Sequence, residues 1–214
     1  MAKVVEIGFF RTGRAGAVPV KIAGIVLAGG ASRRMGSPKA LLPFQGEPFV
    51  GRLTRVLASA CAPVVVVLGH GADAVRPAIP PQAVTVMNPA PERGQLSSLQ
   101  CALRVLPDDA GAVMFTPVDY PAVMPDTVRR LAAAMTAGTP PVVVPRYEGR
   151  RGHPVCVRAD VAAELQALGP EARASDVIHH HRPQTVYLDV DDPGVVDDVD
   201  DPEAYRRLAD REPA

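Results

Sequence analysis

The sequence predicts an α/β fold built on a mostly parallel β-sheet, and three observations lead to this prediction. Short apolar runs alternate with longer segments whose apolar residues recur at helical spacing. One run, residues 64–67, consists of four consecutive valines, as expected for a parallel strand covered on both faces. No internal repeat or low-complexity linker interrupts the pattern, so residues 22–214 are predicted to form a single domain.

The first half of this domain alternates regularly between strands and helices. Residues 22–27 form a buried apolar run that predicts the first strand. The segment 48–60 predicts a helix, because its apolar residues lie at helical spacing and Pro48 stands near its first turn. The further elements predicted in this half are a strand at 63–68, a short helix or turn at 72–79, a strand at 83–87 and a helix at 95–106.

The second half continues in the same way. Residues 125–137 predict a helix that Pro125 opens and Gly138 closes. The other predicted helices cover residues 159–168, 174–180 and 202–209. The predicted strands cover residues 112–116, 142–144, 154–157 and 185–190.

The composition excludes several classes of function. The chain has 23 basic and 23 acidic residues, 4% aromatics and no Trp, which argues against nucleic-acid binding. No apolar run approaches the length that spans a membrane. The three cysteines, Cys61, Cys101 and Cys156, show no metal-binding spacing and are predicted to be buried thiols in a reducing compartment, the cytoplasm. Residues 1–21 are interpreted as an N-terminal extension, with an added edge strand as the alternative.

The loop after the first predicted strand is far longer than an ordinary strand-to-helix connection. It begins with Gly29 and Gly30 and continues through Arg34 to Lys39. Glycines let a backbone approach a ligand closely and expose its N–H groups, and the cations add positive charge, a combination that suits a polyphosphate. The loop fits neither the Walker A pattern nor the dinucleotide fingerprint. A plain turn at the two glycines is the alternative.

Carboxylates follow two later strands of the predicted sheet. Asp119 comes directly after the strand at 112–116, and an acidic cluster at 197–201 follows the last strand. Because ligands bind beyond the carboxyl ends of such strands, we expect Asp119 to meet the phosphate loop and to bind Mg²⁺, with a second carboxylate from the cluster. As alternatives, Asp119 forms a simple turn and Asp201 caps the final helix.

The histidines invite a metal interpretation that the sequence does not favour. The run 179–181 lies on a predicted helix, where consecutive side chains point in different directions, so an exposed helix end is expected. His153 lies in a loop that enters a strand, a place where a structural hydrogen bond is the ordinary role.

Taken together, these segments resemble the signatures of the molybdenum-cofactor nucleotidyltransferases, over nearly the whole chain from residue 22 to residue 208. The specific match is residues 27–43, LAGGASRRMGSPKALLP. Weaker matches are residues 94–98, residues 117–121, residues 152–155 and residues 198–203. The resemblance implies a Rossmann-like three-layer sandwich, as in nucleotide-diphospho-sugar transferases, and Mg²⁺-dependent transfer of a nucleoside monophosphate to a phosphorylated acceptor.

The resemblance also implies a role for each matching residue. Asp119 is implied to bind the metal, with Asp198 or Asp200 as the second carboxylate, and Arg34 and Lys39 to neutralise the phosphates as catalytic cations. His153 is implied to contact the acceptor or to support its loop. The residues implied to bind the nucleotide are Leu27, Ala28, Gly29, Gly30, Arg34, Lys39, Gly94, Ser97 and Ser98.

The features that carry the resemblance disagree about the nucleotide. Gly29 matches guanylyl-transferring members, whereas the short spacing of residues 35–39, the Ser97–Ser98 segment and the segment 152–154 match cytidylyl-transferring ones. The expected reaction is therefore transfer of CMP from CTP to molybdopterin or the molybdenum cofactor, with GTP as the alternative donor. A sugar or polyol phosphate is the alternative acceptor, and a non-catalytic nucleotide- or cofactor-binding protein that delivers cofactor to a molybdoenzyme is the alternative of another class. The protein partner expected for the enzyme is a molybdoenzyme or a chaperone.

Overall fold

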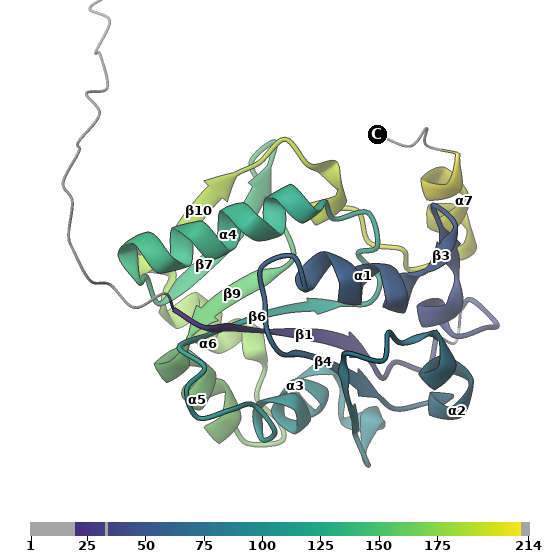
Figure 1. Cartoon of the computed structure of the whole chain (residues 1–214), viewed down its shortest axis with the longest axis horizontal. Coiled ribbons are helices and arrows are strands. Elements are labelled where there is room, and N and C mark those ends of the chain that lie inside the picture. The colour runs from purple at the N-terminus through teal and green to yellow at the C-terminus, as the bar shows by residue number, and fades with distance from the viewer. Residues whose placement is uncertain (1–19, 33, 211–214) are drawn as a thin grey trace, which may run out of the picture.

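The computed structural model describes residues 20–32 and 34–210. Its main feature is an eight-stranded sheet in which seven strands follow the order β10-β7-β9-β6-β1-β4-β5, while β8 pairs with β7 (Figure 1). The strands are β1 (Ile22–Ala28), β4 (Val64–Leu68), β5 (Val84–Met87), β6 (Ala112–Pro117), β7 (Val142–Tyr147), β8 (Arg150–Arg151), β9 (Val155–Arg158) and β10 (Val186–Asp189). Two further short strands, β2 (Pro43–Phe44) and β3 (Glu47–Pro48), form a separate hairpin.

Helices cover both faces of the sheet, which gives three layers (Figure 1). The helices are α1 (Phe49–Leu57), α2 (Ala72–Val75), α3 (Gln95–Leu103), α4 (Pro125–Gly138), α5 (Ala159–Ala167), α6 (Ala174–His180) and α7 (Pro202–Ala209). One apolar core packs the sheet against α1, α4 and α7, and the other packs it against α3, α5 and α6. None of the described helices is long and apolar enough to cross a membrane.

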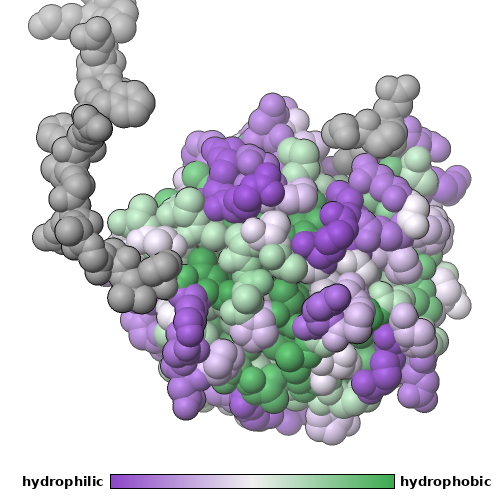
Figure 2. All heavy atoms as spheres, viewed as in Figure 1, coloured by the Kyte–Doolittle hydropathy of each residue, from purple (hydrophilic) through white to green (hydrophobic). Residues whose placement is uncertain are grey.

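The central strand β1 shows why both faces are covered. Val26 belongs to the core on the α1 side, while Ile25 and Leu27 belong to the core on the α3 side. Successive side chains of a strand point to opposite faces, so a continuous apolar run can serve two cores at once. The surface, in contrast, mixes hydrophilic and hydrophobic residues on the face that Figure 2 shows.

The predicted fold class is confirmed, and the sheet is mostly parallel. Among the described strands, β8 and β9 depart from the parallel arrangement. β9 runs antiparallel to both β6 and β7, and β8 runs antiparallel to β7. The reversal follows the turn Glu148–Gly149, where both residues have positive φ, of 47° and 78°. Such a turn matches the twist of paired antiparallel strands and sends the chain back along β7.

Smaller differences concern the ends of elements. Helix α1 ends at Leu57 rather than at residue 60, and α3 ends at Leu103 rather than at residue 106. The hairpin of β2 and β3 was not predicted, because two-residue strands carry no periodicity. The extension predicted over residues 1–21 lies outside the described residues as far as residue 19.

Candidate functional site

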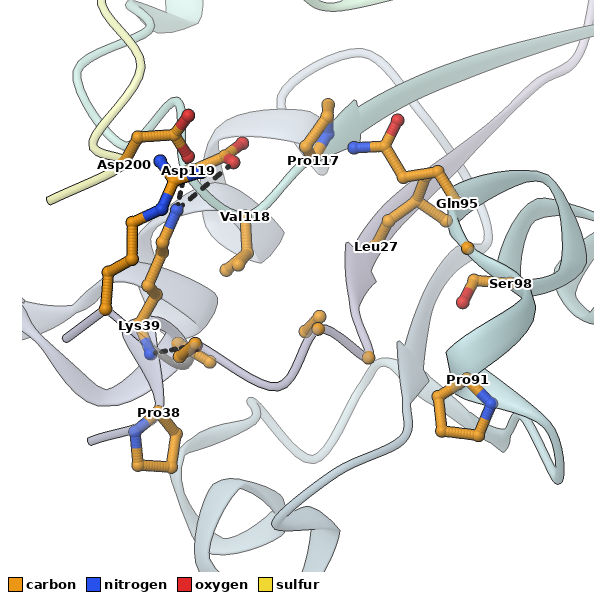
Figure 3. Close-up of a pocket in the computed structure, with 17 residues that line it drawn as sticks. Leu27, Pro38, Lys39, Pro91, Gln95, Ser98, Pro117, Val118, Asp119 and Asp200 are labelled. Atoms are coloured by element: carbon orange, nitrogen blue, oxygen red, sulfur yellow. Dashed lines mark hydrogen bonds and ion pairs between the residues drawn. The ribbon is translucent and has the colours of Figure 1, made fainter. Parts of the chain in front are cut away.

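A cavity of about 390 Å³ lies where β1 and β6 end, at the edge of the sheet where ligands bind in such folds. In Figure 3, Lys39, Asp119 and Asp200 lie on one side of it, and Pro91, Gln95 and Ser98 lie on the opposite side. The lining residues are Leu27, Ala28, Gly29, Gly30, Ser32, Arg34, Pro38, Lys39, Ala40, Pro91, Gly94, Gln95, Ser98, Pro117, Val118, Asp119 and Asp200.

The long loop after β1 forms one wall of this cavity. The backbone N–H of Lys39 donates to Ser32 Oγ at 2.9 Å, which closes the loop on itself before a short 3₁₀ turn over Lys39–Leu41. At the start of the loop, a Cβ on Gly69 would lie 2.6 Å from the carbonyl oxygen of Gly29. Only a glycine at position 69 permits this close approach of the loops after β1 and β4.

An ion-paired cluster occupies one end of the cavity. Lys39 Nζ lies 2.6 Å from Asp200 Oδ1 and 3.6 Å from Asp119 Oδ2. The side chains of Lys39 and Asp119 are largely buried, at 13% and 22% exposed, while that of Asp200 is 50% exposed. The structure thus brings together one cation of the predicted phosphate loop and two of the predicted carboxylates.

The loop that carries Asp119 is held from three directions. Buried Arg52 of α1 donates from Nε to the carbonyl oxygen of Pro121 at 2.6 Å. Buried Asp192 accepts from the backbone N–H of Met124 and from the hydroxyl of Thr127, which holds the start of α4 against the segment after β10. In addition, the backbone N–H of Val199 donates to the carbonyl oxygen of Asp119 at 2.8 Å, which ties the acidic segment to this loop.

Burial and the nearby charge of Lys39 have opposite effects on the pKa values of the two carboxylates. Burial raises the pKa of Asp119 above its ordinary value, and Lys39 opposes that shift. The hydrogen bond from Lys39 lowers the pKa of Asp200. Asp119 Oδ1 is buried without a hydrogen-bond partner. An unpaired carboxylate oxygen beside a second carboxylate is a donor set that suits a hard divalent cation.

The remaining predicted metal ligand, Asp198, does not line this cavity. Asp198 is exposed and lines a separate cavity of about 190 Å³ with Arg150 and Arg207. Across the described residues, no group of three or more His, Cys, Asp or Glu side chains is placed to hold a metal ion. Any cation bound by Asp119 and Asp200 therefore needs further ligands from a substrate or water.

The opposite end of the cavity is built by the segment that opens α3. The two predicted serines differ there, because Ser98 lines the cavity, whereas the hydroxyl of Ser97 donates to the carbonyl oxygen of Gly94 at 2.8 Å. Buried Asn88, which follows β5, donates to both hydroxyl oxygens. Asn88 was not among the predicted site residues, although it directly follows a predicted strand, the place where ligand-binding side chains are expected.

His153 does not line the cavity. Its backbone N–H donates to the carbonyl oxygen of Val195 at 2.8 Å, and its ring lies 4.7 Å from that of Tyr120. A Cβ on the preceding Gly152 would lie 1.9 Å from the same carbonyl oxygen, so a glycine is required there. These contacts support the loop and the segment around Val195.

The acid sensitivity of the fold is expected to depend on His153. Burial lowers the pKa of its ring from 6.5 to about 4. Between pH 6.5 and about pH 4, the unfolded chain therefore binds a proton at this ring that the folded chain does not bind. The contribution of His153 to the free energy of unfolding is therefore fully present above pH 6.5 and is lost as the pH falls to about 4. The free energy of unfolding should fall by up to about 3 kcal/mol over this window. Replacing His153 with Gln should remove this part of the pH dependence. Urea unfolding at several pH values measures the free energy of unfolding of both proteins. If this free energy fell equally with pH in the wild-type protein and the variant, the prediction would be contradicted.

A family model for the MobA-like NTP transferase domain matches residues 24–186, more than half of the chain. The chain belongs to the MobA-like NTP transferase family. A crystal structure of Rv0371c from Mycobacterium tuberculosis supports this placement, with a TM-score of 0.81 at 32% identity over 91% of this chain and 100% of that one. A structure of Rv0371c in complex with manganese has a TM-score of 0.75 at 29% identity, over 90% and 100%.

Curated relatives of this MobA-like chain carry different names. The probable molybdenum cofactor guanylyltransferase of M. tuberculosis is 32% identical over 154 residues, 70% of this chain and 74% of that protein. The nicotine blue oxidoreductase of Paenarthrobacter nicotinovorans is 31% identical over 207 residues, 87% of this chain and 96% of that protein. Membership of the family therefore leaves the substrates to be argued from the site.

The similarity to a third relative concerns only part of that protein. The bifunctional protein GlmU of Kineococcus radiotolerans is 42% identical over 137 residues, which make up 60% of this chain. The chain spans between 25 and 30% of the length of the three GlmU proteins that it matches.

Proposed function

We propose that this chain moves a nucleoside monophosphate from a nucleoside triphosphate to the terminal phosphate of a molybdopterin-type acceptor and releases pyrophosphate. The observation that carries the proposal is the meeting of Lys39, Asp119 and Asp200 at one end of a cavity whose other end is lined by Ser98. A cation with two carboxylates suits a triphosphate with its metal ion, and the far end leaves room for a nucleoside.

The reaction needs no nucleophile from the protein. An oxygen of the acceptor phosphate attacks the α-phosphorus, the bond from that phosphorus to the oxygen bridging to the β-phosphate breaks, and pyrophosphate leaves with the bridging oxygen. Negative charge grows on the leaving group, and Lys39 and Arg34, which both line the cavity, neutralise it. The glycines of the loop let its backbone lie against the phosphates.

We propose that Asp119 and Asp200 hold Mg²⁺ together with the phosphates. A divalent cation in this place supplies charge neutralisation and orients the triphosphate. The buried, unpartnered oxygen of Asp119 supports this assignment, and so does the manganese complex of Rv0371c. Asp198, which interacts with Asp200 and lines the neighbouring cavity, is the alternative second carboxylate.

The proposed donor is CTP, which rests on the resemblance of the Ser97–Ser98 and 152–154 segments to cytidylyl-transferring members. GTP is the rival donor, because Gly29 matches guanylyl-transferring members and a relative is named as a guanylyltransferase. Ser98 and Gly29 are neighbours in the cavity, since a Cβ on Gly29 would lie 3.2 Å from Ser98 Oγ. Gly29 and Ser98, which point to different donors, therefore lie in the same region of the site.

We expect pyrophosphate release when CTP, Mg²⁺ and molybdopterin are supplied together. The assay compares CTP, GTP, ATP and UTP, each with molybdopterin, its molybdenum form or a sugar phosphate as acceptor. Release with GTP alone would show that GTP and not CTP is the donor. Release with a sugar phosphate alone would show that the acceptor is a sugar phosphate and not molybdopterin. No release with any pair would contradict nucleotidyl transfer and leave cofactor delivery, or an oxidoreductase like the relative from P. nicotinovorans, as the next hypothesis.

The product of such a reaction must be passed on to an enzyme that uses it, so we propose a molybdoenzyme or its chaperone as a partner. We place the reaction in the cytoplasm. Support comes from the three cysteines, Cys61, Cys101 and Cys156, which are all free thiols, as is usual in a reducing compartment.

A further inference from the structure

A buried amide lies behind the nucleoside end of the cavity. Asn88 is 2% exposed and follows β5, and its backbone N–H donates to the carbonyl oxygen of Leu68 at 2.8 Å. Its side-chain Oδ1 accepts from the backbone N–H of Ala90 at 2.9 Å. Because a backbone N–H can only donate, this contact fixes which end of the amide is the oxygen.

The orientation of the amide determines the direction of the next two hydrogen bonds. Asn88 Nδ2 lies 2.9 Å from Ser97 Oγ and 3.0 Å from Ser98 Oγ. An amide nitrogen only donates, so both serine oxygens accept from it. Each serine then has its own proton left to donate.

The two serines use that proton differently. Ser97 donates to the carbonyl oxygen of Gly94 at 2.8 Å, within the protein. Among the described residues, 20–32 and 34–210, the Ser98 hydroxyl makes a single hydrogen bond, which it accepts from Asn88. Ser98 lines the cavity, on the side opposite Lys39 and Asp119 (Figure 3). Its proton is therefore available to a ligand.

We propose that Asn88 is a positioning residue, which makes the Ser98 hydroxyl a hydrogen-bond donor aimed into the cavity, and that this donor reads a carbonyl oxygen of the nucleotide base. The inference rests on the proposed function, since it takes the ligand to be a nucleotide. Cytosine, guanine and uracil carry such an oxygen and adenine carries none. The pair Asn88–Ser98 thus selects against ATP.

Gly29 keeps this donor accessible. A Cβ at this position would lie 3.2 Å from Ser98 Oγ and 3.5 Å from the backbone nitrogen of Gly69. Gly29 does not have the positive φ that would by itself require a glycine. The glycine is therefore explained by the space in front of Ser98 rather than by its backbone conformation.

The decisive variant is Asn88→Asp, which keeps the shape of the side chain. Its carboxylate still accepts from Ala90, but it now also accepts from the serines, so the proton of Ser98 turns away from the cavity. Ser98→Ala removes the same donor without touching the buried amide, and Ser97→Ala is the matched control. Affinities for non-hydrolysable analogues of CTP, GTP, UTP and ATP are measured by calorimetry with Mg²⁺, after each variant is shown to unfold cooperatively.

We expect Asn88→Asp and Ser98→Ala each to lose about ten-fold in affinity for the preferred analogue, the scale of one hydrogen bond, and to lose a similar factor in preference over ATP. The double variant should lose no more than either single one, because both remove the same donor. Gly29→Ala should act in the same direction, and Ser97→Ala should leave the preference unchanged. Additive losses, or an equal effect of Ser97→Ala, would overturn the proposal.

The pyrophosphate assay separates this inference from the proposed function. Normal release by variants whose base preference is unchanged would overturn the role of Asn88 and leave nucleotidyl transfer standing. Nucleotide binding that depends on Ser98, without release by the wild-type protein, would support Asn88 and overturn the transfer reaction. A wild-type protein that binds none of the analogues would overturn both.

Discussion

Replacing Asp119 with asparagine or alanine is expected to abolish turnover while the fold is retained. The carboxylate supplies charge and a free oxygen at the end of the cavity where the proposed cation binds. The loss of one such electrostatic group costs on the order of 10²- to 10³-fold in kcat, and the loss of a metal ligand adds to it. Pyrophosphate release under saturating Mg²⁺ measures the effect.

The stability of the Asp119 variants should stay close to that of the wild-type protein. The charged form of this carboxylate is disfavoured by burial, which raises its pKa, so little stabilisation is lost when the charge is removed. The bond from the Val199 backbone uses the carbonyl oxygen of Asp119, which both variants keep. Asp126→Asn, at an exposed carboxylate on the first turn of α4, is the matched control. Near-normal turnover in the Asp119 variants would show that the reaction does not need this carboxylate.

Replacing Lys39 with methionine or alanine is expected to lower kcat/KM by about 10²-fold, the scale of one lost electrostatic stabiliser. The same change should strengthen the binding of free Mn²⁺ or Mg²⁺ in the absence of nucleotide. The reason is that the ammonium group, 2.6 Å from Asp200 and 3.6 Å from Asp119, competes with a metal ion for these carboxylates. Calorimetric titration with Mn²⁺ measures the second effect.

Lys21→Met is the matched control for the Lys39 variants, because Lys21 is exposed, pairs with Asp109 and lies outside the cavity. It should change neither turnover nor metal affinity. The two effects expected for Lys39 have opposite signs, so damage to the fold cannot imitate them. If the Lys39 variants lost both metal affinity and turnover, the proposed competition between the ammonium group and the metal ion would be contradicted.

The alternating apolar runs predicted most of the fold. The helix at residues 202–209 has the predicted bounds, because Asp201 and Pro202 mark its start in the sequence, and the helix predicted at roughly residues 174–180 covers those residues. The reversed direction of β9 was not predicted. A strand's own residues do not encode its direction, which here depends on the turn Glu148–Gly149.

The candidate site was predictable where charge and strand ends coincide. Lys39, Asp119 and a carboxylate from the cluster 197–201 follow from the rule that ligands bind beyond the carboxyl ends of strands. The choice of Asp198 or Asp200 within that cluster came from the family resemblance. The difference between Ser97 and Ser98 was not predictable, because it depends on where each hydroxyl proton goes. That depends in turn on Asn88, which the fold brings against both serines. A direction of hydrogen bonding is a property of a three-dimensional network and has no counterpart in residue spacing.

The contact between Lys39 and Asp200 joins residues that are 161 positions apart. A ribosome adds residues in order, so a nascent chain carries the phosphate loop long before it carries the second carboxylate. A contact of such large sequence separation also costs loop-closure entropy before it stabilises the chain. The end of the cavity that Lys39 and Asp200 form is therefore incomplete until residue 200 has left the exit tunnel. Under the proposed function, an emerging chain presents no finished site that could trap nucleotide.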